Sequence, residues 1–357
     1  MTKILYLADT LGVGGAERQL SLLVKYLPSG WERRVWSLNH GSFADEIRSS
    51  GISVDIHERR FRYDILPIID LWRVMLRWRP DIVHSWGWVC SAATGPICRL
   101  LGIPWIDGSI RIGGAPVRHK MRAKLALLLA NRVVTNSLAG LRAMNIPEKR
   151  GRVVYNGFDP ERLALTEKAV DKSDIFTVVM VGRMSPFKDY ETFIEVAKSL
   201  GKNGANAKWH FLALGYGPQR EELIKSASDL IDQGLLDFPD AGLEVLPYVR
   251  QAQAGVLMTR PPNTEGCSNA IMEYMACGLP VICSESGGNR ELVVDGVTGF
   301  IVPPMNISAL EDKLLWLHAH PDQAQTMGMA GRKRFCNHFT VEKFIEKNLS
   351  VYQELLR

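Results

Sequence analysis

Hydrophobic positions in the first 160 residues fall in short runs, separated by segments with one apolar face. The runs that predict strands are ILYLA (4–8), RVWSL (34–38), SVDI (53–56), DIVHS (81–85), PWID (104–107) and RVVTN (132–136). Helical spacing between them predicts helices from about Ala16, over 42–50 and over 66–79. Strands that alternate with helices of about 10–15 residues favour a parallel sheet covered on both faces.

The alternation pauses and then begins again. Residues 153–174 run through Asn-Gly, Pro and mixed charge, which is typical of a linker. The second series comprises strands at 176–182, 209–215, 243–249, 254–259 and 280–284, and helices at 189–201, 218–228, 269–277, 307–318 and 322–357. We therefore expect two doubly wound, Rossmann-like α/β domains, 1–160 and 170–338. Open sheets of this kind bind ligands at the carboxyl ends of their strands, so a central cleft between the domains is expected.

Bulk composition agrees with a globular enzyme. The 357 residues are 46% hydrophobic and 23% charged, with no apolar run of about 18 residues that could span a bilayer. The six cysteines form no CxxC pair and no Cys/His cluster with metal spacing, and the N-terminus reads as a buried strand instead of a signal peptide. These features predict a cytoplasmic protein with reduced thiols.

Charge is distributed unevenly along the chain. Residues 1–160 contain 23 Lys and Arg against 13 Asp and Glu, a net charge of +10, whereas residues 161–357 have a net charge of −5. A basic half beside an acidic half suggests that the first half meets an anionic partner.

Loops that leave strands of the second half carry groups suited to a phosphorylated ligand. Arg183 and Lys188 follow the strand at 176–182; an arginine can hold a phosphate with two hydrogen bonds, and a lysine adds a point charge. Gly215 and Gly217 follow the strand at 209–215, where glycine lets a backbone approach a ligand closely. The alternatives are two solvated loop cations and a plain tight turn.

The stretch TEGCSNAIMEYMACGLPVICSESGG (264–288) places Glu265 on a loop and Glu273 in the second turn of the following helix. Ser268 is a plausible N-cap for that helix, whose free backbone amides can bind an anion. Carboxylates accept hydrogen bonds from paired sugar hydroxyls, so the two glutamates could hold the sugars at both ends of a nucleotide diphosphate-sugar. Alternatively, they are a helix-dipole acid and a surface glutamate.

These motifs together resemble glycosyltransferase family 4, retaining sugar transferases of the GT-B fold. The matching stretches are GVGGAERQLSLL (12–23), VVYNGFD (153–159), VGRMSPFKDYETFIEVA (181–197), LGYGPQREEL (214–223) and 264–304. Residues 338–356 resemble the family's closing helix, so we expect a helix at about 340–357 to pack back on the first domain.

The resemblance implies roles for particular residues. Glu273 would bind ribose hydroxyls, Glu265 would contact the donor sugar, and Arg183 and Lys188 would hold the diphosphate and stabilise it as it leaves. Gly14 and Gly15 match the family's N-terminal glycine loop. The donor site is expected to include these residues and the loop segment Gly266, Cys267, Ser268 and Asn269.

One position departs from the family pattern. Relatives often carry His-x-His at the end of the strand at 81–85, but the sequence of this chain is His84-Ser85-Trp86. His84 therefore stays open between a place beside the donor or acceptor and a buried strand-end histidine.

Two basic, aromatic segments in the first half suggest a membrane surface. Residues 59–80 contain six arginines with Phe61, Trp72 and Trp78, and residues 118–132 begin with a basic turn. Such helices lie readily on anionic lipid, although a core helix with a solvated basic face has the same pattern. Neither segment forms a recognised nucleic-acid reading module, so no nucleic-acid partner is expected.

The combined expectation is a retaining transferase that moves a hexose from a UDP- or GDP-sugar to a carbohydrate or lipid-linked acceptor in cell-surface polysaccharide or glycolipid assembly. No cofactor is expected, and no Asp-x-Asp motif for a metal occurs. We expect it in the cytoplasm, peripheral on the inner face of the membrane. The alternatives are a sugar-nucleotide epimerase of the same architecture and a non-catalytic sugar-nucleotide or lipid-binding protein.

Overall fold

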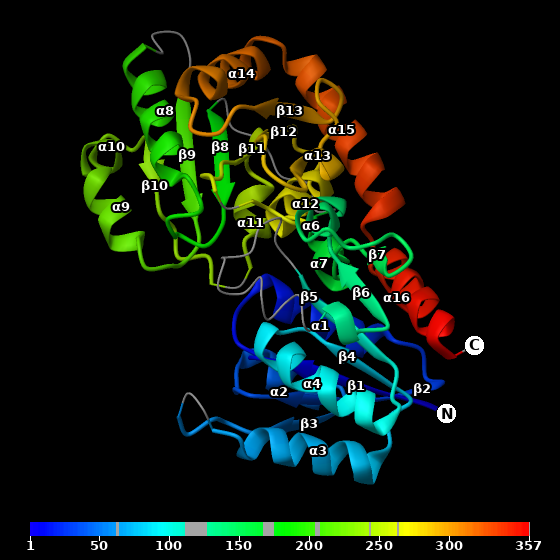
Figure 1. The fold of residues 1–357 in the computed structure, drawn as a ribbon. Coiled ribbons are helices and arrows are strands. Elements are labelled where there is room, and N and C mark those ends of the chain that lie inside the picture. The colour runs from blue at the N-terminus through cyan, green and yellow to red at the C-terminus, as the bar shows by residue number, and fades with distance from the viewer. Residues whose placement is uncertain are drawn as a thin grey trace. The chain divides into compact units, whose positions relative to one another are not determined.

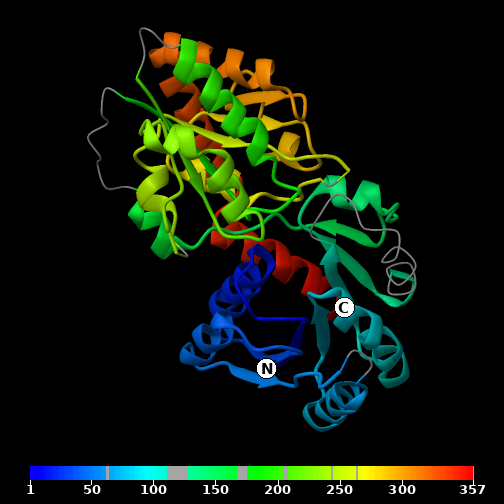
Figure 2. The same cartoon turned by 90° about the vertical axis from the view of Figure 1, so that its left-hand side faces the viewer.

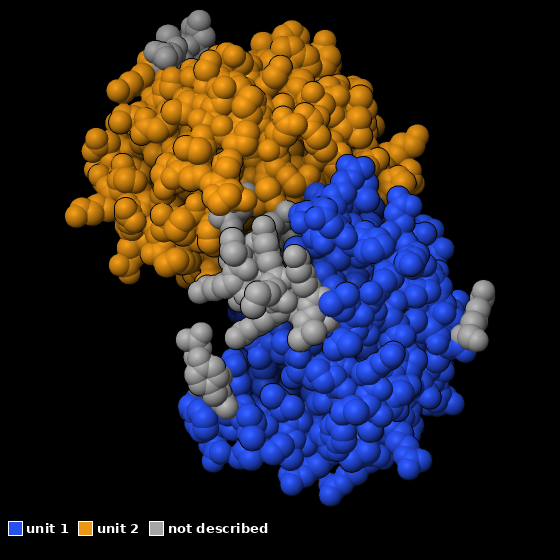
Figure 3. All heavy atoms as spheres, viewed as in Figure 1, with its two compact units in different colours: residues 1–157, 341–357 blue, residues 158–340 orange. Residues whose placement is uncertain are grey.

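A computed structural model describes residues 1–61, 64–110, 127–166, 175–203, 208–242, 244–262 and 264–356. The chain forms two compact units, shown in separate colours in Figure 3. Unit 1 comprises Met1–Gly157 and Val341–Arg357, and unit 2 comprises Phe158–Thr340. Residues 111–126 are not among the described residues. They include the basic first part of the helix expected over 118–132, so that part of the expectation stays a prediction.

Unit 1 is built on a parallel sheet with the strand order β3-β2-β1-β4-β5-β6-β7. The order reverses beside β1, because β2 pairs with one edge of it and β4 with the other. The strands are β1 (Thr2–Ala8), β2 (Trp31–Ser37), β3 (Ser53–Ile56), β4 (Ile82–Ser85), β5 (Trp105–Ile110), β6 (Arg132–Thr135) and β7 (Gly151–Val153).

Helices cover both faces of this sheet (Figures 1 and 2). They are α1 (Gly15–Tyr26), α2 (Ser42–Ser49), α3 (Leu66–Trp78), α4 (Trp88–Leu101), α6 (Leu138–Ala143) and α16 (Val341–Leu356). Side chains alternate along β1, as the two-residue period of a strand requires. Ile4 and Tyr6 join the core formed with α1, α2 and α16, whereas Leu5 and Leu7 join the core formed with α3 and α4.

Unit 2 is built on a second parallel sheet, with the order β10-β9-β8-β11-β12-β13. Its strands are β8 (Phe176–Val181), β9 (Trp209–Leu214), β10 (Leu236–Asp237), β11 (Ala254–Leu257), β12 (Val281–Ser284) and β13 (Gly299–Val302). Its helices are α7 (Pro160–Leu165), α8 (Tyr190–Asn203), α9 (Arg220–Ser226), α10 (Ser228–Asp232), α11 (Leu246–Val249), α12 (Asn269–Ala276), α13 (Asn289–Leu292), α14 (Ile307–Ala319) and α15 (Pro321–His338). These two parallel-sheet α/β units are the architecture expected from the sequence.

Each face of the second sheet has its own packing partner. Val178 and Met180 of β8 belong to a core that includes Phe193 of α8 and Leu314 of α14. Tyr274 of α12 is fully buried; its hydroxyl donates to the Val256 carbonyl at 3.0 Å and accepts from the Val181 amide at 2.6 Å. That hydroxyl therefore ties α12 to two central strands.

The strand expected at 243–249 is wrong, because Leu246–Val249 forms the short helix α11. Pro247 occupies its first turn, where the missing N–H costs nothing, whereas in a central strand it would leave a ladder hydrogen bond unmade. Strands β10 and β13 were also not predicted from the sequence pattern. The helical stretch expected over 322–357 divides into α15 and α16, with Phe339 and Thr340 between them.

Among the helices that the structure describes, none is long and apolar enough to cross a membrane.

Candidate functional site

The order of strands in unit 2 reverses between β8 and β11, which makes the loops after these strands the first place to look for a ligand site. The two loops are joined by backbone hydrogen bonds. The Asp189 amide donates to the Met258 carbonyl at 3.1 Å, and the Arg260 amide donates to the Phe187 carbonyl at 3.0 Å. Two segments about 70 residues apart in sequence thus form one platform at the carboxyl edge of the sheet.

Lys188 and Glu265 meet on this platform. Their side chains form an ion pair, and each is 18% exposed. Arg183 precedes Lys188 on the loop after β8; it is exposed and has no ion pair with any residue that the structure describes. The structure therefore brings together three of the charged residues singled out in the sequence on adjoining loops, two of them in contact.

Gly215 and Gly217 allow the loop after β9 to approach the loop after β8. Both have positive φ, +141° and +157°, and a Cβ atom at either position would collide with the carbonyl oxygen of Gly182 or Met184. The Tyr190 hydroxyl lies 2.9 Å from the Gly182 carbonyl and 2.9 Å from the Leu214 carbonyl. It therefore links the two loops at the point where they approach each other. The close approach that these glycines permit is to neighbouring backbone.

The loop before α12 is held by its neighbours. Ser268 caps α12 by accepting from the Ile271 amide at 3.4 Å, as its place in the sequence predicts. The Glu265 carbonyl accepts from the Gly288 amide at 2.9 Å. Gly266, Cys267 and Ser268 are buried and Asn269 is half-buried. The loop that carries Glu265 therefore has a defined backbone on both sides of the carboxylate.

Glu273 is buried, and its partner is a residue that the sequence analysis placed in a linker. The Arg162 guanidinium on α7 donates to Glu273 Oε1 at 2.8 Å and to both oxygens of Glu244 at 2.9 and 3.1 Å. Burial pulls the pKa of Arg162 down, but the charges and hydrogen bonds of Glu273 and Glu244 outweigh burial and raise that pKa. Arg162 therefore forms a direct ion pair with a buried carboxylate on α12.

A helix-start signal in the sequence could have drawn attention to Arg162. The pair Asp159-Pro160 opens α7, with the Asp159 side chain accepting from the Glu161 amide at 2.9 Å and Pro160 in the first turn. This signal places Arg162 on a helix, although only the fold places it against Glu273.

A second ion pair missed in the sequence holds the platform. The Arg260 guanidinium lies 2.8 Å from Oδ1 of Asp189, which is fully buried, and Thr192 donates to the other oxygen of Asp189 at 2.6 Å. Asp189 thus caps α8 and fixes the loop after β11 at once. Among the described residues, no cluster of His, Cys, Asp and Glu could hold a metal ion.

The remaining candidate residues lie in unit 1. Gly14 is the N-cap of α1 in an extended conformation, and Gly15 is the first residue of that helix, directly after the loop that leaves β1. His84 is fully buried on β4, and its Nδ1 lies 2.9 Å from the Tyr352 hydroxyl on α16. The Tyr6 hydroxyl lies 3.2 Å from the same oxygen. His84 is therefore a buried strand-end side chain that links the sheet to the last helix.

Two family models match successive parts of the chain. "Glycosyltransferase Family 4" matches residues 13–162, and "Glycosyl transferases group 1" matches residues 175–320. The chain belongs to glycosyltransferase family 4. The resemblance found in the motifs is thereby confirmed.

Curated relatives of this family match parts of the chain. An uncharacterized glycosyltransferase of Methanocaldococcus jannaschii is 28% identical over 58% of this chain and 55% of its own length. A GDP-mannose-dependent alpha-(1-6)-phosphatidylinositol monomannoside mannosyltransferase of Mycolicibacterium smegmatis is 31% identical over 49% of this chain and 47% of its own length. The chain thus spans about half the length of these two relatives.

Solved structures show that the fold is GT-B. The Anabaena protein HepE in complex with UDP superposes with a TM-score of 0.83 at 19% identity, covering 99% of this chain and 100% of that one. A glycosyltransferase from Rickettsia africae superposes with a TM-score of 0.84 at 17% identity, covering 100% and 99%. At such identities the likeness concerns the fold alone.

Proposed function

We propose that this family 4 protein is a retaining glycosyltransferase that moves a hexose from a UDP- or GDP-sugar to a carbohydrate or lipid-linked acceptor. The observation that carries the proposal is the Lys188–Glu265 ion pair at the reversal of strand order in unit 2, with exposed Arg183 on the same loop. Cations and a carboxylate at this edge match the chemistry of a sugar diphosphate.

In this proposal the donor's diphosphate lies between Arg183 and Lys188. The phosphates replace Glu265 as the partner of the Lys188 ammonium. The Glu265 carboxylate is then available to accept hydrogen bonds from the transferred sugar. Glu273 binds the ribose hydroxyls at the other end of the donor, while the hydrogen bond from Arg162 orients its carboxylate. Cys267, Ser268 and Asn269 offer their backbone at the start of α12.

The chemical step then depends on electrostatics and positioning. As the glycosidic bond to the diphosphate breaks, negative charge grows on the leaving oxygen, where Lys188 and Arg183 stabilise it without a metal. The departing phosphate helps to take the acceptor's proton on the same face of the sugar, which retains the anomeric configuration. Holding acceptor and donor in this geometry supplies much of the rate enhancement.

Donor identity is testable by ligand-dependent stability. HepE was solved with UDP and with UDP-glucose, and the mycobacterial relative is named for GDP-mannose, so both bases are candidates. A thermal-shift screen of UDP, GDP and ADP sugars should show one class stabilising the protein by about 2.7 kcal/mol at 100 times its dissociation constant. No stabilisation by any of them, at concentrations up to several millimolar, contradicts the proposal.

The transferase proposal and its rivals predict different results. An epimerase releases an altered nucleotide-sugar without any acceptor, which chromatography of the reaction detects. A non-catalytic binder transfers no sugar in either the wild type or Glu273→Ala. If Glu273→Ala binds the nucleotide as tightly as the wild type, Glu273 does not contact the ribose.

We also propose that unit 1 works at the cytoplasmic membrane surface, in polysaccharide or glycolipid assembly. Helix α3 buries Pro67, Leu71 and Met75 and exposes Ile69 and Leu76 among its arginines. This combination of exposed apolar and basic side chains suits an anionic lipid surface. Sedimentation with anionic vesicles should carry the protein down at low salt and release it at high salt; no sedimentation at low salt excludes this part of the proposal.

A further inference from the structure

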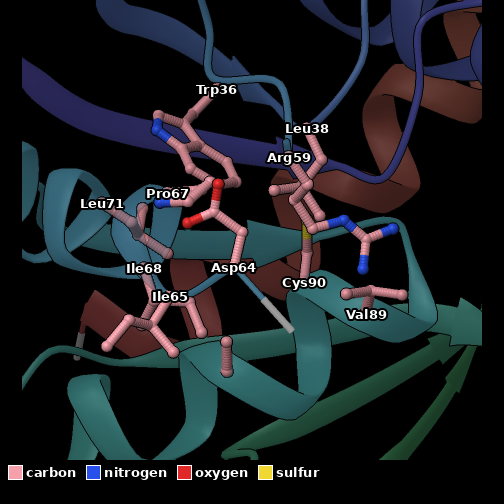
Figure 4. Close-up of a pocket in the computed structure, with 11 residues that line it drawn as sticks. Trp36, Leu38, Arg59, Asp64, Ile65, Pro67, Ile68, Leu71, Val89 and Cys90 are labelled. Atoms are coloured by element: carbon pink, nitrogen blue, oxygen red, sulfur yellow. The ribbon is translucent and has the colours of Figure 1, made fainter. Parts of the chain in front are cut away.

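Unit 1 contains an apolar cavity of about 270 Å³ between α3, α4 and the end of β2 (Figure 4). Its apolar walls include Trp36, Leu38, Ile65, Ile68, Leu71 and Ala93. The volume is just below the range of roughly 300–1,000 Å³ typical of small-molecule sites. Water gains few hydrogen bonds from such walls, so an apolar ligand is the better occupant.

The cavity lies at the edge of the sheet where a Rossmann-like unit binds ligands. Trp36 is near the carboxyl end of β2, and Leu38 follows that strand. Val89 and Cys90 belong to the first turn of α4, directly after the carboxyl end of β4. The cavity therefore opens among the same set of strand-end loops that includes the glycine loop after β1.

Two charged side chains line this cavity, and they differ in their partners. The negative charge of Asp64 is compensated by its neighbours. Its carboxylate accepts hydrogen bonds from the Arg60 amide and guanidinium at 3.1 Å each and from the Leu66 amide at 3.0 Å. These hydrogen bonds hold the pKa of Asp64 below its usual value. Arg59 is exposed and has no hydrogen bond or ion pair with a described residue, and Figure 4 shows its guanidinium beside Val89.

Apolar side chains continue from the cavity to the surface. Ile65 is 63% exposed although it lines the cavity, and Phe61, Leu66 and Ile69 nearby are also exposed. A free guanidinium therefore stands at the border of a continuous apolar path from solvent to the interior, a combination that suits a molecule with an anionic head and a hydrocarbon tail.

We propose that this cavity receives the hydrocarbon chain of a lipid-linked acceptor whose phosphate pairs with Arg59. The inference rests on the proposed function, because it specifies the acceptor class of that transferase. The chain's apolar part is buried against Trp36, Leu71 and Ala93, and the phosphate stays at the surface. The sugar-accepting end of the lipid then remains at the carboxyl edge of the sheet of unit 1.

The test measures binding of monoalkyl phosphates to the full chain by calorimetry, below their micelle concentrations. Affinity should rise about fourfold for each added methylene until the cavity is full and then level off. A dodecyl phosphate with a photoreactive diazirine at the end of its chain should label Leu71, Cys90 or Ala93, located by mass spectrometry.

Two variants separate the parts of the site. Ala93→Phe fills the cavity and should weaken dodecyl phosphate at least tenfold, whereas Ala143→Phe, at an exposed position of α6, should leave the affinity unchanged. Arg59→Gln should weaken dodecyl phosphate about tenfold and dodecanol not at all. Circular dichroism confirms that each variant is folded.

Several results overturn the inference. They are an affinity independent of chain length, labelling confined to the outer surface of α3, or an unchanged affinity in Ala93→Phe. Self-association through this face, seen as a dimer in sedimentation velocity that Ile65→Ser abolishes, also overturns it. Nucleotide-sugar binding is measured separately, so a protein that binds the donor but no alkyl phosphate retains the proposed function and loses only this acceptor class.

Discussion

The carboxyl edges of the two parallel sheets carry different chemistry on the same architecture. In unit 2 this edge is organised by ion pairs, with Lys188–Glu265 and Arg260–Asp189 on the loops and Arg162–Glu273 between α7 and α12. In unit 1 the loops at the same edge enclose an apolar cavity. Function in such folds resides in the loops. Under our proposals, the ionic edge of unit 2 binds a polyanionic donor and the apolar cavity of unit 1 binds a hydrocarbon chain.

Removing a buried cation should break the ionic edge most severely. Arg162→Met removes the buried guanidinium that pairs with Glu273 and Glu244, so we expect a loss of about 3–5 kcal/mol in the free energy of unfolding, measured by urea denaturation. The control is Arg290→Met, which removes an ion pair that is more than half exposed on both sides, 55% and 57%, and should cost less than about 1 kcal/mol. Equal losses of stability in the two variants would show that the buried ion pairs of Arg162 contribute no more to the free energy of unfolding than an exposed ion pair does.

A methyl group at Gly215 tests the loop crossing that supports this edge. Gly215→Ala meets both a strained φ and the Gly182 carbonyl, so a loss of about 2–4 kcal/mol is expected. Gly234→Ala is the matched control, since its φ of +66° is also positive but the space around it is open, and it should cost only about 1 kcal/mol. Thermal unfolding of both variants measures the two losses of stability. Equal losses would show that the loops after β8 and β9 have room for a methyl group at position 215.

Neutralising Lys188 tests the catalytic side of the comparison. Lys188→Met should lower kcat/KM for the nucleotide-sugar about 100-fold, which corresponds to about 2.7 kcal/mol of lost transition-state stabilisation. Lys198→Met, at an exposed position on α8, should leave turnover within about twofold. Steady-state kinetics with the donor identified by thermal shift distinguish the two, and an active Lys188→Met enzyme would remove this residue from the proposed mechanism.

The smallest effect is expected in unit 1, where Glu354 ties α16 to the sheet. The hydrogen bond from Arg152, aided by Arg132, lowers the pKa of Glu354 below its ordinary value of 4.5. Its contribution to stability is therefore present above pH 4.5 and is lost as the pH falls through the lower pKa of the folded state. Glu354→Gln should cost about 1 kcal/mol at pH 7, since the side chain is 31% exposed, and progressively less below pH 4.5.

Stability measured against pH checks this expectation. The wild type and Glu354→Gln should converge in acid, and Glu346→Gln, in an exposed pair with Lys343, should have a smaller effect at every pH. A constant gap between wild type and Glu354→Gln would mean that its packing, and not its charge, holds α16.

The segment from 236 to 249 shows where sequence patterns fail. Val245, Leu246 and Val249 are all buried, and a short apolar run of this kind fits a buried strand and a buried helical turn equally well. Pro247 was the available signal against a central strand. The two-residue strand β10 is too short to have any periodicity, so its pairing with β9 depends on the sheet.

Local rules determined much of this protein from its sequence: the alternation of strands and helices, the cap at Ser268 and the loop positions of Arg183, Lys188 and Glu265. These features follow from the geometry of a few consecutive residues, which is the same wherever the segment lies. Only the tertiary structure decided which charge meets which. Arg162 reaches Glu273 across 111 positions, and the cavity arises from three elements distant in sequence. Such partners depend on how the elements pack, and no local period in the chain specifies that.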